Sequence, residues 1–170
     1  MRILGAALLV AACTWLGIAR AGELRFHRRC VDDVLSALRY LEAEVRAAGT
    51  PLPEIYAALA ERRNFAPRCV FEMLARGAKA DGDGCMGALW SACWLRETHV
   101  ALTQNERRSL ARLGPVLGRY PAREQSLALL ACIAQFERAS AYWETRARDG
   151  AKLSASVGLT MGLMLAAALV

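Results

Sequence analysis

The two ends of this chain are long uncharged stretches, and they constrain its fold more than any other feature. Residues 3–19 carry no charged side chain and are bracketed by Arg2 and Arg20. Residues 153–170 are also uncharged and reach the last residue. A helix needs about 17 to 25 predominantly apolar residues to cross a bilayer. The sequence therefore predicts one transmembrane helix at each end.

Basic residues gather on the inner side of both stretches. They are Arg25, Arg28 and Arg29 after the first stretch, and Arg146, Arg148 and Lys152 before the second. Lys and Arg close to a membrane span are retained on the cytoplasmic side. We therefore expect residues 20–150 to form one domain on the cytosolic side of the cell membrane. The net charge of +6 suits a surface close to anionic lipid headgroups.

The first stretch also fits two export patterns. Ala19-Arg20-Ala21 satisfies a small-x-small cleavage pattern, and the residues that end at Cys13 fit the pattern of a lipid-modified cysteine. An exported lipoprotein or periplasmic helical module, lipidated at Cys13, is therefore the alternative. The arginines that follow the stretch oppose translocation and favour a retained anchor.

Helical periodicity runs through the middle of the chain. Apolar residues recur at spacings of three and four in residues 23–48, where Gly49 is expected to end a helix that continues from the first span. The same pattern predicts helices from Pro53, over 68–75, from Met86, after a capping box of Thr103 and Glu106, and over 121–148. We expect a loop over 77–84 and a helix end at Asp149-Gly150. The fold class predicted is all-α, an antiparallel bundle of about six helices flanked by the two transmembrane helices.

Aromatic and aliphatic residues define the expected inner faces of these helices. They are Ile55, Tyr56 and Leu59; Val70, Phe71 and Leu74; Trp90 and Trp94; and, in the last helix, Leu127, Leu130, Ile133, Phe136, Ala139 and Trp143. A stripe of tryptophan at helical spacing is more often core than a partner surface.

Motifs that carry chemistry are weak in this sequence. Residues 82–87 match G-x-G-x-x-G, but a dinucleotide site needs a preceding strand, and none is predicted. A calcium loop beginning at Asp81 would need a glutamate where Ala92 stands. No recognised nucleic-acid motif appears among the arginines. No catalytic residue, cofactor or small-molecule substrate is therefore predicted.

The cysteines and histidines lack the close paired spacings of zinc sites. His27 and Cys30 are three residues apart, but none of the six cysteines forms a C-x-x-C pair. No metal site is predicted, and free cysteines buried in a reducing compartment are expected. A membrane-bound enzyme that uses cysteine and histidine is the weakest hypothesis.

Two segments between the predicted spans carry a family resemblance. Residues 35–53 read LSALRYLEAEVRAAGTPLP, and residues 102–125 read LTQNERRSLARLGPVLGRYPAREQ. With Phe71 and Trp90 between them, and with Gly-x-Lys-Leu opening the last stretch, the chain resembles the stage III sporulation protein AB family of endospore-forming bacteria. The segment LGPVLGRYPAREQ is the most specific part of the resemblance.

The resemblance implies a function and partners. It implies a bundle similar to the cytoplasmic domain of the inner-membrane platform protein of type II secretion systems. It also implies membership of a channel-like complex in the membrane around the forespore, acting from the mother-cell side, with a secretion-ATPase-like partner. We therefore predict a non-enzymatic scaffold that contacts the lipid bilayer and other stage III proteins.

Five polar residues in the two segments are the candidates for partner binding. They are Glu42, Glu44, Arg119, Glu124 and Gln125. The alternative interpretation is that they are exposed or capping residues of solvated helices.

Overall fold

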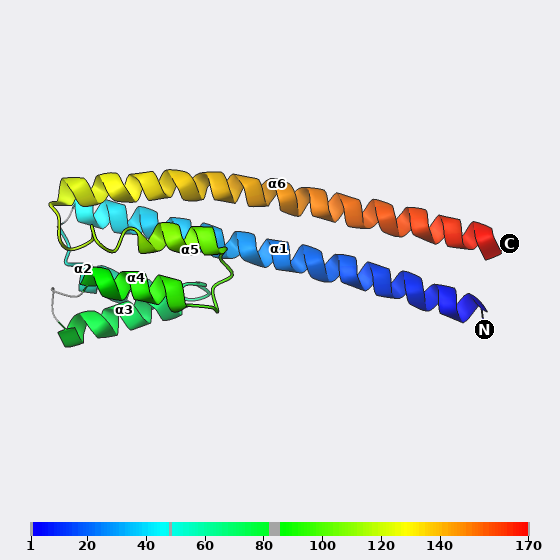
Figure 1. Ribbon diagram of the computed structural model, residues 1–170, viewed down its shortest axis with the longest axis horizontal. Helices are drawn as coiled ribbons and strands as arrows, with labels where there is room; N and C mark the ends of the chain where they lie inside the picture. The colour runs from blue at the N-terminus through cyan, green and yellow to red at the C-terminus, as the bar shows by residue number, and fades with distance from the viewer. Residues whose placement is uncertain (1, 48, 82–85, 170) are drawn as a thin grey trace. The chain divides into compact units, whose positions relative to one another are not determined.

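Six α-helices make up the regular structure of the residues described here. The computed structural model describes the backbone of residues 2–47, 49–81 and 86–169, and the side chains of residues 15, 19–20, 22–47, 49–80 and 86–149. The helices are α1 (Arg2–Ala47), α2 (Leu52–Ala60), α3 (Arg68–Asp81), α4 (Met86–Arg96), α5 (Gln104–Ala111) and α6 (Ala122–Leu169), labelled in Figure 1. The described residues contain no strand, so the predicted all-α class is confirmed for them.

The chain divides into two compact units. One unit is Arg29–Ser140, and the other consists of Met1–Arg28 with Ala141–Val170. Helices α1 and α6 contribute to both units, whereas α2 to α5 belong to the first alone. Within the first unit α2 packs on α3, α3 on α4, and α4 on α5.

Local sequence explains where these helices begin and end. α1 stops before Gly49, whose φ of 59° lies in the left-handed region that glycine tolerates best. Pro53 lies in the first turn of α2, where its missing N–H leaves no partner unsatisfied. α5 opens with the predicted capping box, because Thr103 accepts from the Glu106 N–H and the Glu106 carboxylate accepts from the Thr103 N–H.

A cluster of aromatic rings forms the core between α2, α3 and α4. Phe71 lies at its centre, with ring centroids 6.1 Å from Tyr56, 5.9 Å from Phe65, 6.3 Å from Trp90 and 6.1 Å from Trp94. Both tryptophans are 1% exposed, as the helical spacing predicted. These separations are typical of offset and edge-on aromatic pairs.

Polar contacts hold α1 against α6 in the same unit. Ser126 donates to the carboxylate of Glu42 over 2.7 Å, and the Arg39 guanidinium lies 2.7 Å from the Glu137 carboxylate. The paired residue numbers rise along α6 as they fall along α1, so the two helices run antiparallel here.

Two predicted helix boundaries are wrong. α3 continues through Gly77 to Asp81, although a loop was expected from residue 77, and α6 continues through Asp149-Gly150. A glycine inside a helix costs only about 1 kcal/mol relative to alanine, which is too little to end a helix with helix formers on both sides. At Gly77 the missing side chain also has a packing role, since a Cβ there would overlap the Leu89 side chain.

The predicted inner face of the last helix is also partly wrong. Leu127 and Leu130 are 60% and 47% exposed, whereas Leu129, Cys132 and Phe136 are buried. The face of α6 that packs in the core therefore excludes these two leucines. Cys132 behaves as a small apolar residue, and it was not counted in the hydrophobic pattern.

The predicted membrane spans fall largely outside the described side chains. Residues 3–19 and 153–170 have helical backbone within α1 and α6, but only Trp15 and Ala19 among their side chains are described. Within the described residues, no helix combines the length and apolar character needed to cross a membrane. The two spans are therefore not confirmed.

The aromatic cluster gives a direct test of the core. Replacing Phe71 with alanine should lower the free energy of unfolding by about 3 to 5 kcal/mol, because a buried ring is lost and a cavity remains. The measurement is urea unfolding of the full chain in mild detergent, followed by tryptophan fluorescence.

Met73 provides the control for this test. It lies on the same helix and is 42% exposed, so Met73→Ala should change stability by less than about 0.5 kcal/mol. Equal losses from the two variants would contradict the assignment of Phe71 to the core.

Candidate functional site

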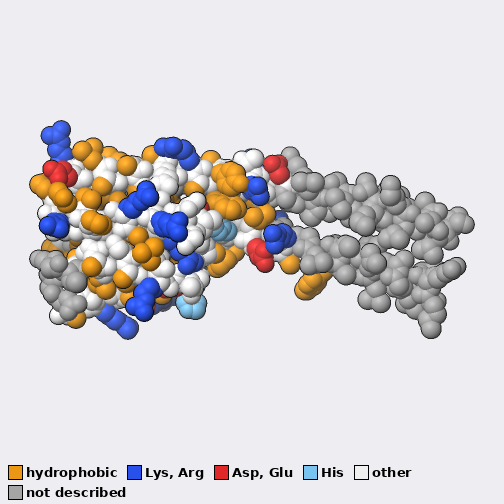
Figure 2. Space-filling model, viewed as in Figure 1, with side chains coloured by type: hydrophobic (Ala, Val, Ile, Leu, Met, Phe, Trp, Pro, Cys, Tyr) orange, Lys and Arg blue, Asp and Glu red, His pale blue; other side chains and the backbone are white. Residues whose placement is uncertain are grey.

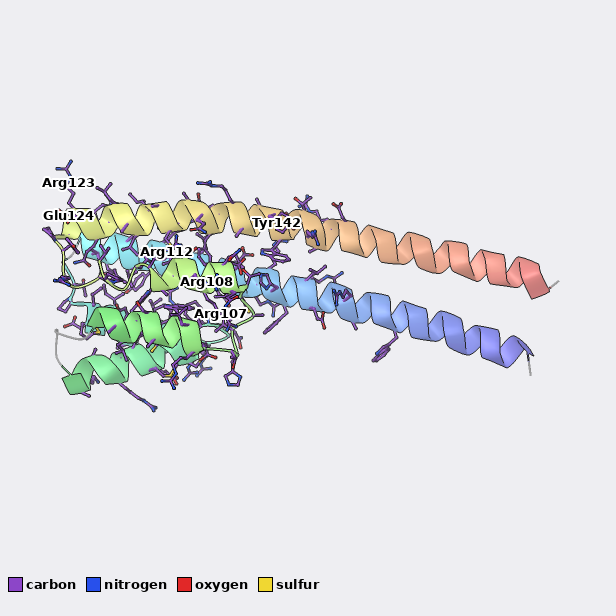
Figure 3. The ribbon with its side chains drawn as sticks, in the orientation of Figure 1. Arg107, Arg108, Arg112, Arg123, Glu124 and Tyr142 are labelled. Atoms are coloured by element: carbon purple, nitrogen blue, oxygen red, sulfur yellow. The ribbon has the colours of Figure 1, made fainter. Side chains whose placement is uncertain are left out.

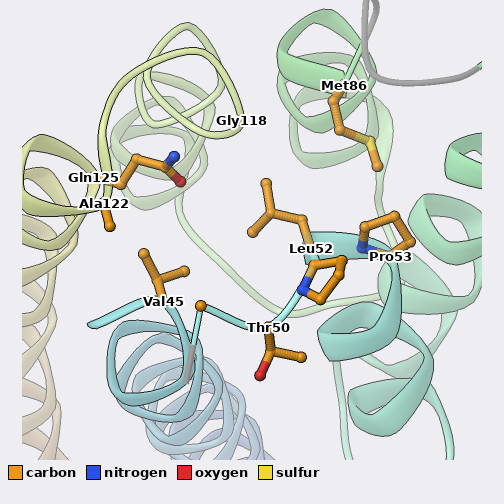
Figure 4. Close-up of a pocket in the computed structure, with 10 residues that line it drawn as sticks. Val45, Thr50, Leu52, Pro53, Met86, Gly118, Ala122 and Gln125 are labelled. Atoms are coloured by element: carbon orange, nitrogen blue, oxygen red, sulfur yellow. The ribbon is translucent and has the colours of Figure 1, made fainter. Parts of the chain in front are cut away.

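The segments of the family resemblance meet at one place in the Arg29–Ser140 unit. The end of α1, the turn into α2 and the start of α6 surround a cavity of about 260 Å³, shown in Figure 4. Its lining residues include Val45, Thr50, Leu52, Met86, Gly118, Ala122 and Gln125. We take this junction and the adjoining residues 113–125 as the candidate site.

Of the five predicted partner-binding residues, Glu42 is part of the core contacts. It is 8% exposed, accepts from Ser126, and pairs with the Arg46 Nε at 3.0 Å. A buried carboxylate with these partners stabilises the packing of α1 on α6. Glu42 therefore offers no free surface for another protein.

Glu44 and Gln125 hold backbone turns beside the cavity. Glu44 accepts from the Thr50 hydroxyl over 2.8 Å, across the turn that contains Gly49. The Gln125 Nε2 donates to the Tyr120 carbonyl over 2.6 Å, which fixes the amide orientation. Its Oε1 is buried and accepts no hydrogen bond from the described residues.

Arg119 and Glu124 are exposed, and they are the two predicted residues that present charge to solvent. Arg119 borders a second cavity, of about 480 Å³, between α4 and residues 114–119. Glu124 lies in the first turn of α6, where a carboxylate interacts favourably with the helix dipole. The structure thus separates the five residues into three that hold the fold and two on the surface.

Close packing between α4 and residues 113–118 explains the glycines of the most specific segment. A Cβ on Gly87 would overlap the Gly114 carbonyl, and a Cβ on Gly114 would overlap the Ser91 hydroxyl. Ser91 donates to the Ala111 carbonyl over 2.8 Å. Gly87 is also the last glycine of the G-x-G-x-x-G match. Of the residues in that match, Gly87 contributes to packing, and residues 82–85 lie outside the part of the chain that the structure describes.

Trp90 adds a hydrogen bond between α4 and α5. Its Nε1 donates to the Leu110 carbonyl over 2.7 Å, where α5 approaches its end. The side chain is buried, so the bond satisfies its ring N–H, while the Leu110 carbonyl also accepts from the Leu113 N–H. Trp90 therefore joins the aromatic core to α5.

Sequence reasoning missed a group of exposed arginines between the start of α5 and the start of α6. Arg108, Arg112 and Arg123 are exposed and form no ion pair with the described residues. Figure 3 shows Arg108 on α5, Arg112 just after it, and Arg123 at the start of α6. Figure 2 shows many basic and few acidic side chains on this face of the unit. The signal was present in the sequence, because residues 107–123 contain five arginines and no acidic residue.

The cysteines form no arrangement suited to metal binding or catalysis within the described residues. Cys30, Cys69, Cys93 and Cys132 are free thiols, and no group of three or more His, Cys, Asp or Glu side chains there could hold a metal ion. Burial raises the pKa of each thiol, and it raises that of Cys132 to about 12. Thiols held protonated in this way are poor nucleophiles. Cys13 and Cys85 lie outside the described side chains.

The described residues define a small all-helical protein whose polar side chains mainly hold helices together. The chain belongs to the stage III sporulation protein AB family, which it matches over residues 2–170. The stage III sporulation protein AB of Bacillus subtilis (strain 168) is 25% identical over 172 residues, covering 97% of this chain and 96% of that protein. No solved structure matches the chain, and the similarity to a secretion platform domain stays a prediction.

The glycine contact predicts a specific sensitivity. Gly87→Ala should lower the free energy of unfolding by about 1 to 3 kcal/mol, because the new methyl group meets the Gly114 backbone carbonyl, which cannot rotate away. Gly22→Ala is the control, since nothing lies within 4 Å of its Cβ position and alanine favours helix. Denaturant unfolding of the full chain measures both. A Gly87 variant as stable as the parent would contradict the close packing.

The raised pKa of Cys132 predicts slow alkylation. At pH 8 a thiol with a pKa of about 12 is about 10⁻⁴ thiolate, against roughly a tenth for an ordinary value of 9.0. Iodoacetamide should therefore label Cys132 far more slowly in the folded chain than in urea. The alkylation rate of Cys132 should continue to rise above pH 9, whereas the alkylation rate of an exposed thiol levels off there. Peptide mass spectrometry over time checks this, and equal rates in the folded and unfolded chain would contradict it.

Proposed function

We propose that this chain is a non-enzymatic membrane component of a sporulation channel complex, and that its helical unit holds other subunits of that complex in place. The observation that carries the proposal is the family match over residues 2–170, nearly the whole chain. Under this proposal the protein acts through binding surfaces, so its polar residues need only position helices and partners.

Membrane attachment at both ends is part of the proposal. It rests on the uncharged residues 3–19 and 153–170, together with the arginines on their inner sides. The bulk of the chain, residues 20–150, then lies in the mother-cell cytosol at the membrane surrounding the forespore. Its partners are other stage III proteins, including one that resembles a secretion ATPase.

Surface charge is consistent with such a role. The exposed Arg108, Arg112, Arg119 and Arg123 make the surface formed by residues 108–123 basic. Exposed charge of one sign steers association with partners of the opposite sign. Arg119 contributes to this basic surface, whereas Glu124 is exposed and carries the opposite charge.

Genetic complementation tests the proposal. Deleting the gene in the organism that encodes this chain should reduce the yield of heat-resistant spores, and the full chain should restore it. A chain lacking residues 153–170 should accumulate without restoring spores, because it has lost one anchor. A deletion strain with an unchanged spore yield would overturn the proposed function.

Cysteine accessibility tests the topology within the same strains. Lys79 is exposed on α3, so Lys79→Cys supplies a reactive thiol above the background of the parent chain. A membrane-impermeant maleimide should label it only after the membrane is opened. Labelling of intact cells would instead favour the exported module lipidated at Cys13.

A further inference from the structure

The outward side of α6 carries an apolar stripe that nothing in the described structure covers. Leu127 and Leu130 are 60% and 47% exposed, Ala131 is exposed, and Ala134 is half-buried. Residues 127, 130 and 134 follow spacings of three and four, which is the pattern of a helix that packs lengthwise against another helix. Two exposed leucines one turn apart are therefore arranged to receive a helix.

Arginines lie at both ends of this stripe. Arg123 precedes Leu127 by one turn, and Arg138 follows Ala134 by one turn; both are exposed. A third, Arg112, is the residue that directly follows α5. This helix contacts α6, since Gln135 of α6 donates to Ser109 of α5 over 2.8 Å. Figure 3 shows Arg112 beside α5, where the helix ends, and Arg123 at the start of α6.

These arginines differ from others in the same unit. Arg39, Arg46 and Arg68 each lie within 3.0 Å of a carboxylate oxygen of Glu137, Glu42 and Glu72, respectively. By contrast, no carboxylate of the described residues pairs with Arg112, Arg123 or Arg138. The pairing with Arg39 neutralises Glu137, which leaves Glu124 as the one exposed, unpaired carboxylate of residues 122–138.

We propose that this surface, the α6 seam formed by Arg123, Leu127, Leu130, Ala134 and Arg138, binds an acidic amphipathic helix of a protein partner. Apolar residues of the incoming helix would cover the two leucines, and its flanking Asp or Glu residues would pair with the arginines. This proposal rests on the proposed scaffolding function, and it specifies that the partner segment is an acidic amphipathic helix.

Charge argues against a second copy of this chain as the occupant. In an antiparallel pair of seams centred between residues 130 and 131, Arg123 of one copy faces Arg138 of the other. In a parallel pair each arginine faces its own counterpart. Like charges opposed in this way weaken association, whereas an acidic helix relieves the unpaired charge.

Site-specific photocrosslinking in sporulating cells tests the proposal. A benzoylphenylalanine at Ala131 borders the seam, beside Leu130 and one turn after Leu127, and one at Ala92 of α4 is the control on another exposed helix position. Crosslinked peptides are mapped by mass spectrometry. We expect Ala131 to capture a helical segment of another protein with Asp or Glu flanking its apolar positions, and Ala92 not to capture it.

Matched variants then measure the two kinds of contact. R123E combined with R138E should lower the Ala131 crosslink by about tenfold, and the double glutamine variant should have a smaller effect. Leu127→Ser should also lower it, whereas Leu95→Ser, at a leucine 52% exposed on α4, should not. Equal amounts of each variant in the membrane fraction show that folding is intact.

Several outcomes would overturn the proposal. They are crosslinks from Ala131 to lipid, to a second copy of the chain or to a segment without acidic flanks, and a yield that R123E with R138E leaves unchanged. If spore formation still requires the chain in those cases, the proposed function stands and its partner binds elsewhere. If spore formation does not require the chain, the proposed function itself fails.

Discussion

Burial of the Phe71 cluster is the constraint on which the Arg29–Ser140 unit depends. Helices α2, α3, α4 and α5 have 9, 14, 11 and 8 residues, and helices of such length are marginal on their own in water. They persist because aromatic rings from three of them share one core. Trp90 extends that core to α5 through its bond to the Leu110 carbonyl. The arrangement of the short helices is therefore set by a few buried rings.

Polar groups have a different role. They fix the lengthwise register of one helix against another, which apolar contacts alone do not determine. Glu42 with Ser126 fixes one level of the α1–α6 pair, and Arg39 with Glu137 fixes another. Glycines act similarly between α4 and residues 113–118, where Gly87 and Gly114 allow backbone contact. Much of the sequence in the two segments that carry the family resemblance is thus explained by packing and alignment.

Sequence reasoning predicted the all-α class, the aromatic core and the capping box because each depends on local pattern. It placed the face of α6 wrongly because Leu127 and Leu130 fit a helical period as well as Leu129 and Cys132 do. Only the packing against α1 decides between them. Partner binding by the five candidate residues stays a prediction. Arg119 and Glu124 are exposed, whereas Glu42 is buried against a residue 84 positions away that no local pattern reveals. Glycine was also given too much weight as a helix end at Gly77 and Gly150.

The pairing of α1 with α6 has a consequence for synthesis of the chain. The bonds of Glu42 and Asp32 to α6 join residues 84 and 108 apart, so they form only when the last helix has left the ribosome. The rings of the aromatic cluster, by contrast, all lie within residues 56–94 and are complete earlier. Contacts between near residues also form faster than those that close long loops. The nascent chain should therefore form the aromatic core before α6 can pack on α1, so the face of α1 that contacts α6 is exposed during that interval.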